Sequence, residues 1–87
     1  RNISAENFVE RMRDLENIAT SFKGIDKAYA ISAGREVRVI VSPQTVDDLS
    51  AIKLARDIAN KVESTMQYPG TIKVNVIRET RAVEFAK

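Results

Sequence analysis

Apolar and polar residues alternate with two different periods along the chain, and these periods predict both helices and strands. In the first 24 residues the apolar positions recur three and four apart, which is typical of a helix with one buried face. These positions are Phe8, Met12, Leu15, Ile18, Ala19 and Phe22. Ser4 is placed to cap this helix, and Gly24 can supply the left-handed residue that ends it.

A period of two follows and predicts a β-hairpin over residues 27–41. Tyr29, Ile31 and Ala33 alternate with small residues, so we expect a first strand over 27–33 whose Tyr29 side faces the core. Gly34 and Arg35 are expected to form a two-residue hairpin loop. In the second strand, over 36–41, the inward positions are Val37, Val39 and Val41. Ile40 interrupts the outward polar face, which predicts that something covers it.

Residues 47–66 return to the helical period. Asp47 and Asp48 stand where a helix N-terminus favours negative charge. The expected buried stripe comprises Leu49, Ile52, Ala55, Ala59, Val62 and Met66, widened by Leu54 and Ile58. After a turn at Tyr68-Pro69-Gly70, a third strand carries Ile72, Val74 and Val76.

The predicted order is therefore α-β-β-α-β, an α+β fold built as a two-layer sandwich. We expect a three-stranded sheet with both helices on one face. The strand order stays open between an antiparallel 2-1-3 sheet and a mixed 1-2-3 sheet. The side chains expected to be almost fully buried are Leu15, Ile31, Val39, Ile52, Ala59, Val62 and Val74.

Composition limits what such a chain can do. Eighty-seven residues form one domain, over residues 1–87, with a small core. There is no cysteine, so disulfides and thiolate metal sites are excluded. No apolar run reaches the roughly 18 residues that a bilayer requires, so we expect no membrane contact by this segment. The chain begins at Arg1 without methionine, which suggests a piece of a longer protein.

Three ordered stretches carry a resemblance to a known family. They are AYAISAGREVRVIVS, DDLSAIKLARDIA and IKVNVIRETRAVEFAK, within residues 25–87. This part of the chain resembles the extreme C-terminal segment of ribonuclease Y, a bacterial HD-superfamily endoribonuclease that initiates messenger RNA decay. The resemblance implies a cytoplasmic C-terminal accessory domain of an enzyme that is anchored to the bacterial inner membrane and acts on single-stranded RNA. It also implies that the membrane anchor, the KH domain and the HD domain with its divalent metal lie outside this segment.

The residues themselves offer no catalytic site, no metal site and no cofactor site. Without histidine there is no HD motif and no imidazole to act as general acid or base. Asp47 and Asp48 could be taken for a metal-binding pair, but helix capping explains them better. Glu79 and Glu84, flanked by arginines, are expected to form surface ion pairs.

An RNA-contacting surface is the second functional possibility. A KH module needs a Gly-X-X-Gly loop, and the three glycines are too far apart for one. An RRM-like surface needs exposed aromatic residues on the sheet, whereas Tyr29 is expected to face the core. What remains is a group of basic residues that could form one positive edge: Arg35, Arg38, Lys73, Arg78 and Arg81.

Self-association or docking to a protein partner is the first possibility. Residues 79–87 alternate apolar and charged side chains at a chain end, and an incomplete sheet has edges that can pair. Val83 and Phe85 are the residues expected to mediate it. Alternatively, this tail packs on its own domain. A free-standing α+β regulatory domain is the competing interpretation of the whole chain.

Overall fold

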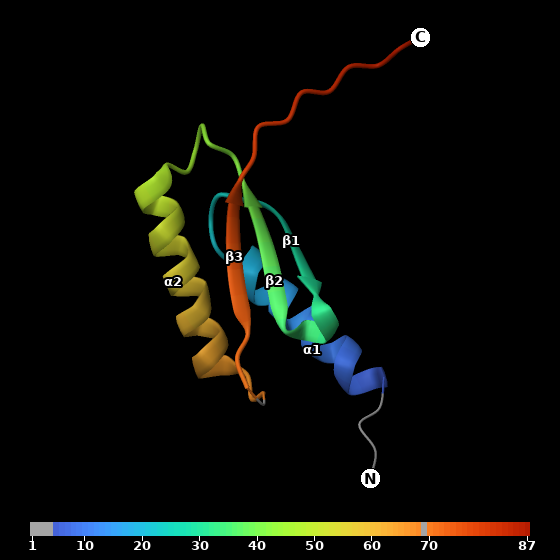
Figure 1. Cartoon of the computed structure of the whole chain (residues 1–87), viewed down its shortest axis with the longest axis vertical. Coiled ribbons are helices and arrows are strands. Elements are labelled where there is room, and N and C mark those ends of the chain that lie inside the picture. Colours follow the sequence, from blue (N-terminus) through green and yellow to red (C-terminus); the bar gives the residue numbers. More distant parts are fainter. Residues whose placement is uncertain (1–4, 69) are drawn as a thin grey trace.

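A computed structural model of the chain describes residues 5–68 and 70–87, and it has the predicted order α-β-β-α-β (Figure 1). The α+β prediction is therefore confirmed. The expected cap Ser4 lies outside the described residues. The elements are α1 (Ala5–Thr20), β1 (Ile25–Ile31), the short 3-10 turn η1 (Ser32–Gly34), β2 (Glu36–Val41), α2 (Asp48–Thr65) and β3 (Lys73–Arg78).

The sheet is mixed, with strand order β1-β2-β3. β1 and β2 pair antiparallel, while β3 lies parallel to β2 on its other side, so the 1-2-3 alternative is correct. Helix α2 forms the crossover that a parallel pair requires, and it packs beside β3. Cross-strand rows run over all three strands, for example Tyr29 opposite Arg38 and Arg38 opposite Asn75.

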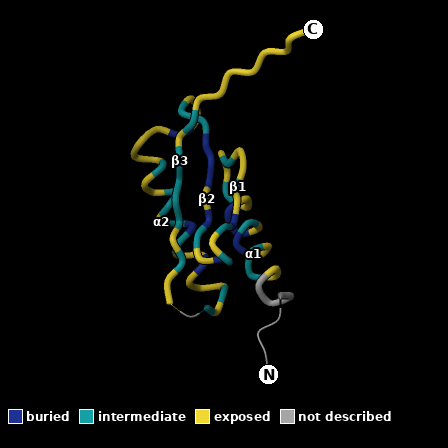
Figure 2. Tube along the Cα trace, turned by 45° about the vertical axis from the view of Figure 1, so that its right-hand side comes forward, coloured by how far each residue is buried: buried dark blue, intermediate teal, exposed yellow. Residues whose placement is uncertain are grey.

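Both helices cover one face of the sheet and enclose the core with it (Figures 1 and 2). Val37, Val39 and Val41 are fully buried on that face, as the alternation in β2 predicts. The other buried members of the core are Leu15, Ile18, Ala19, Ala30, Val46, Ile58 and Val62. In the part of the chain that the structure describes, no helix covers the opposite face of the sheet, so the side chains there form an outer surface.

The predicted orientation of β1 is wrong. Ala30 faces the core and is buried, whereas Tyr29 points to the outer face and remains 45% exposed. The physical reason is the close approach of α1, because small alanine side chains let the helix backbone come near the strand. Glu16 of α1 reaches far enough to accept a hydrogen bond from the backbone N–H of Ala30 at 2.9 Å. This contact also satisfies a donor on the outer edge of the sheet.

The predicted helical stripe of α2 is also displaced around the helix. Ile58 and Val62 are buried, and Ala51, Leu54 and Met66 pack against the core, but Ile52 is exposed. Ile31, Ala59 and Val74 are only partly buried, whereas Leu15, Val39 and Val62 are buried as expected. A three-stranded sheet is too narrow to cover the whole apolar arc of α2.

The hairpin connection is longer than the predicted two residues. β1 ends at Ile31 and β2 begins at Glu36, and the turn between them has three successive left-handed residues, ending with Gly34 at φ +80°. Arg11 of α1 holds this turn by donating from Nη2 to the carbonyl oxygen of Ala33 at 3.0 Å. Gly24 precedes β1 instead of ending α1, whose last residue is Thr20.

Candidate interaction surfaces

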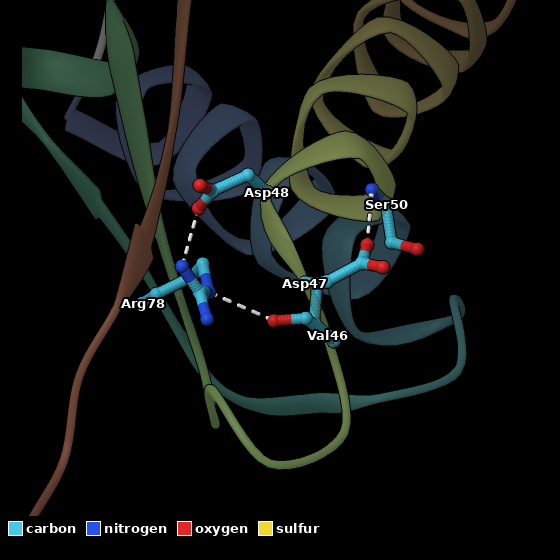
Figure 3. A network of polar contacts seen from close by, with 5 residues as sticks. All are labelled: Val46, Asp47, Asp48, Ser50 and Arg78. Atoms are coloured by element: carbon cyan, nitrogen blue, oxygen red, sulfur yellow. Dashed lines mark hydrogen bonds and ion pairs between the residues drawn. The ribbon is translucent and has the colours of Figure 1, made fainter.

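The acidic residues at the start of α2 are engaged in local structure. Asp47 is the N-cap, and its carboxylate accepts a hydrogen bond from the backbone N–H of Ser50 at 2.8 Å (Figure 3). Asp48 forms an ion pair with Arg78, which lies on the last position of β3 (Figure 3). The two carboxylates thus have different partners, and the capping interpretation of Asp47 is confirmed.

The hydrogen bond from the Ser50 backbone, followed by one from its side chain, holds the pKa of Asp47 below its usual range. A lowered pKa keeps this carboxylate ionised, which suits a cap near the positive end of the helix dipole. Glu79 pairs with Arg81 at 2.8 Å, as expected for an ion pair on the surface. Over residues 5–68 and 70–87, histidine, cysteine and acidic side chains form no group of three that could hold a metal ion.

The segment after β3 leaves the body of the molecule as an extended arm, residues 79–87 (Figure 1). No strand is assigned within it, and all but its first residue are exposed (Figure 2). Val83 is 62% exposed and Phe85 is 81% exposed. The arm therefore neither adds a strand to its own sheet nor packs Val83 and Phe85 against its own core.

A second exposed apolar surface lies on the first turns of α2. Leu49 is 77% exposed and Ile52 is 57% exposed, and we call these two residues the α2 patch. They are three positions apart and so project from neighbouring places on one helix face. Lys53 and Arg56, four positions beyond each, are exposed beside them.

The outer face of the sheet presents a mixed surface. Its central row places Tyr29 of β1 beside Arg38 of β2, and Arg38 beside Asn75 of β3. In the neighbouring row, Glu36 of β2 lies opposite Lys73 of β3. Glu36 also forms an ion pair with Arg38 at 3.4 Å. An aromatic ring next to an arginine on an open sheet can stack on a nucleobase, but here an acid stands between the two basic side chains.

Ile40 lies on this outer face and yet is only 9% exposed, so the expectation that something covers it is confirmed. It borders a cavity of about 250 Å³ that is shared with Lys27, Glu79 and Arg81. The pKa of Arg81 is raised, first by its hydrogen bond to Glu79 and also by that residue's charge. Glu79 also donates its backbone N–H to the carbonyl oxygen of Val41 at 3.0 Å, which ties the start of the arm to β2 beside Ile40. The apolar end of the arm, at Val83 and Phe85, stays exposed.

The five basic residues expected to form one edge are separated by the fold. Arg38, Lys73 and Arg81 lie on or beside the outer face. Arg35 is in the turn after η1, where its carbonyl oxygen accepts from the backbone N–H of Lys73 at 2.9 Å, so these two residues share one end of the sheet. Arg78 lies on the helix side of the sheet, against the start of α2 (Figure 3).

Within residues 5–68 and 70–87, neither helix combines the length and the apolar character that a membrane crossing needs.

The chain was compared with family models, solved structures and curated proteins. No family model matches it, and no solved structure matches it significantly. The curated proteins give a clear result. The chain is 58% identical over all 87 residues to proteins named Ribonuclease Y from Dehalococcoides mccartyi and Listeria monocytogenes, and 54% identical to the one from Staphylococcus epidermidis.

The chain is similar over its whole length to the C-terminal region of ribonuclease Y. The resemblance expected from the sequence is therefore confirmed, and it extends to the N-terminal helix. The chain spans only 16–17% of the length of these ribonuclease Y relatives. What the whole ribonuclease Y molecule does is thus a property of a protein several times longer than this chain.

The α2 patch is the surface that sequence reasoning missed, because Leu49 and Ile52 were assigned to the buried stripe. A signal for it was present in the sequence. Leu49 is followed by Lys53 and Arg56 at helical spacing, so it lies on the polar side of α2. The alternative stripe through Leu54, Ile58 and Val62 has no charged residue at its centre and is the one that the sheet covers.

Proposed function

We propose that this chain is a non-catalytic C-terminal association domain of a ribonuclease Y-like protein. The observation that carries the proposal is the arm, which presents Phe85 at 81% exposure and Val83 at 62% exposure away from the core. Large apolar side chains that a domain leaves uncovered on an extended arm favour contact with another protein surface. The hydrogen bond from the backbone N–H of Glu79 to the carbonyl oxygen of Val41 fixes the point from which the arm departs.

The longer protein, in this proposal, is an endoribonuclease that cleaves single-stranded RNA and initiates messenger RNA decay. Its chemistry, its divalent metal and its membrane anchor would belong to segments outside this chain. Relatives named Ribonuclease Y, of which the matching residues form 16–17%, support this arrangement over a free-standing regulatory domain. The contribution of the present domain would be to bring copies of the enzyme, or the enzyme and a partner, together.

Sedimentation equilibrium of the 87-residue chain over a wide concentration range tests the association. The intact chain is expected to form a dimer or larger species, and deletion of residues 83–87 or the substitution Phe85→Asp is expected to abolish it. Circular dichroism and the thermal midpoint should be unchanged by either alteration, because the arm makes little contact with the core. Val9→Asp provides a matched control, since it adds the same charge at another exposed apolar side chain, on α1.

RNA contact through the outer face is a second candidate, favoured by one specific observation. Tyr29 is exposed on the open face beside Arg38, an arrangement suited to stacking a base of single-stranded RNA. This candidate ranks second because the basic side chains on the outer face are interspersed with acidic ones. Lys27, Arg38, Lys73 and Arg81 alternate there with Glu36 and Glu79, and two of the basic groups are ion-paired to these acids.

Fluorescence anisotropy with an oligouridine at several salt concentrations tests this candidate. If the outer face binds RNA, the affinity falls with salt, and joint replacement of Arg35, Arg38 and Arg81 by alanine makes the fall less steep. Tyr29→Ala should weaken binding with little effect on that slope. Arg13→Ala, an exposed arginine on the helix layer, is the control. Equal effects of the control and the triple variant would count against a defined RNA surface.

A further inference from the structure

Two exposed apolar pairs lie at the same end of the molecule. One is the α2 patch, Leu49 and Ile52, and the other is the pair Val83 and Phe85 on the arm; these are the four most exposed large apolar side chains in the described part of the chain. The end of β3 brings the two regions together. Arg78, the residue before the arm, binds the segment that immediately precedes Leu49 (Figure 3).

The spacing of the two pairs matches. In an extended arm, Val83 and Phe85 project from the same side about 6.6 Å apart, because successive residues rise about 3.3 Å and alternate sides. On a helix, side chains three positions apart, as in Leu49 and Ile52, are about 5–6 Å apart. An extended arm laid over the first turns of α2 can therefore place both of its apolar side chains on the patch at once.

The charges beside the two pairs are complementary. Arg56 and Lys53, the latter paired with Asp57 at 3.0 Å, are exposed next to the α2 patch, and the arm carries Glu84 between its two apolar residues. When Val83 and Phe85 face the helix, the alternation of an extended chain points Glu84 away from α2, so its charge acts at longer range than a direct ion pair. The opposite signs of Arg56 and Glu84 favour approach of the arm to this helix face.

We infer that the α2 patch receives the arm of a second copy of this chain, and that the receiving copy returns its own arm in the same way. This inference rests on the proposed association function and assigns it a docking site. A second copy is the occupant because the arm of the same chain extends away from α2 and leaves the patch uncovered (Figure 1). Each copy then supplies one arm and one patch, as a two-fold symmetric dimer requires.

Sedimentation equilibrium of a variant with both Leu49→Glu and Ile52→Glu tests the receiving site. Glutamate is a good helix former and suits the first turns of a helix, so α2 is expected to stay folded by circular dichroism. The dimer dissociation constant should rise at least about tenfold, as for Phe85→Asp, and Val9→Glu should leave it unchanged. Measurements should extend to concentrations on the order of 1 mM, because a small interface is weak.

Engineered cysteines distinguish contact between copies from contact within one chain. The natural chain has no cysteine, so Leu49→Cys and Val83→Cys can be introduced singly without a competing thiol. A mixture of the two single variants is expected to oxidise mainly to the mixed disulfide dimer. A variant that carries both cysteines should form linked dimers at high concentration. Val9→Cys mixed with Val83→Cys is the control and should give little product.

The outcomes separate the docking site from the proposed function. If Phe85→Asp dissociates the chain while the double glutamate variant still dimerises, the arm mediates association through another surface and the inference is wrong. A predominance of arm-to-arm disulfides, or an intramolecular disulfide in the variant with both cysteines, would also overturn it. A monomeric intact chain at the highest concentration would contradict the proposed association itself.

Discussion

Arg78 joins the last position of β3 to the loop before α2 by donating from Nε to the carbonyl oxygen of Val46 at 2.8 Å (Figure 3). The same guanidinium forms an ion pair with Asp48 in the first turn of the helix. Val46 is itself buried in the core, so this carbonyl belongs to a segment with little freedom to move. The contact therefore fixes the start of α2, and with it the α2 patch, relative to the point where the arm departs.

Arg78→Ala should lower the free energy of unfolding by about 1–2 kcal/mol, because the partly buried carbonyl of Val46 loses a charged donor. Arg78→Lys should recover only part of this, since an ammonium cannot reproduce the two-directional geometry of a guanidinium. Asp48→Ala, which removes only the exposed ion-pair partner, should cost less than about 1 kcal/mol. Urea denaturation of the three variants measures these differences. A larger loss for Asp48→Ala than for Arg78→Ala would contradict the assignment.

Two isoleucines of α2 should differ strongly in how much their truncation to alanine lowers stability. Ile58 is fully buried, so Ile58→Ala should cost about 2–4 kcal/mol through lost burial and a cavity. Ile52 is largely exposed, and Ile52→Ala should change stability by no more than about 0.5 kcal/mol in dilute solution, where the chain is monomeric. Chemical denaturation compares the pair directly. Similar losses for both would mean that α2 presents a different face to the sheet.

The turn before β2 depends on Gly34. Its φ is +80°, and an added Cβ would lie 2.8 Å from Nε of Arg11, so Gly34→Ala should destabilise the fold by about 1–2 kcal/mol or more. Gly70→Ala is a matched control, because φ is +75° there and no atom lies within 4 Å of the new Cβ. Repeating Gly34→Ala in an Arg11→Ala background should reduce its cost toward that of Gly70→Ala.

The cap at Asp47 should make stability depend on pH in acid. Its pKa is lowered in the folded chain, so the ionised carboxylate stabilises the fold at neutral pH. This contribution is lost as the pH falls through the ordinary aspartate range toward the lowered folded value. Asp47→Ala should therefore lower the thermal midpoint at neutral pH and have little further effect in strong acid. Asp47→Asn should keep part of the cap without this pH dependence. A gap between Asp47→Ala and the natural chain that widened in acid would contradict this role.

The sequence by itself determined the secondary structure and the fold class, since these depend on local periodicity. The alternation of Val37, Val39 and Val41 predicts one buried face, because Glu36 and Arg38 on the other face are charged. Asp47 likewise acts through a neighbour in the chain, Ser50, so its role as a cap can be predicted without the fold. The hairpin turn cannot, because Arg11 of the distant helix α1 holds it. The family resemblance was also present in ordered sequence stretches. By contrast, the strand order depends on where α2 returns the chain, and no local pattern encodes that.

Only the tertiary structure decided which apolar residues are covered. In β1 both faces carry apolar side chains, and the close packing of α1 selected Ala28 and Ala30 for the core, leaving Tyr29 outside. In α2 the apolar arc is wider than a narrow sheet can cover, so Leu49 and Ile52 stay exposed. Burial depends on how much surface the partner element offers, which is a property of the assembled layers. The candidate docking surface is therefore visible only once the helix has been placed on the sheet.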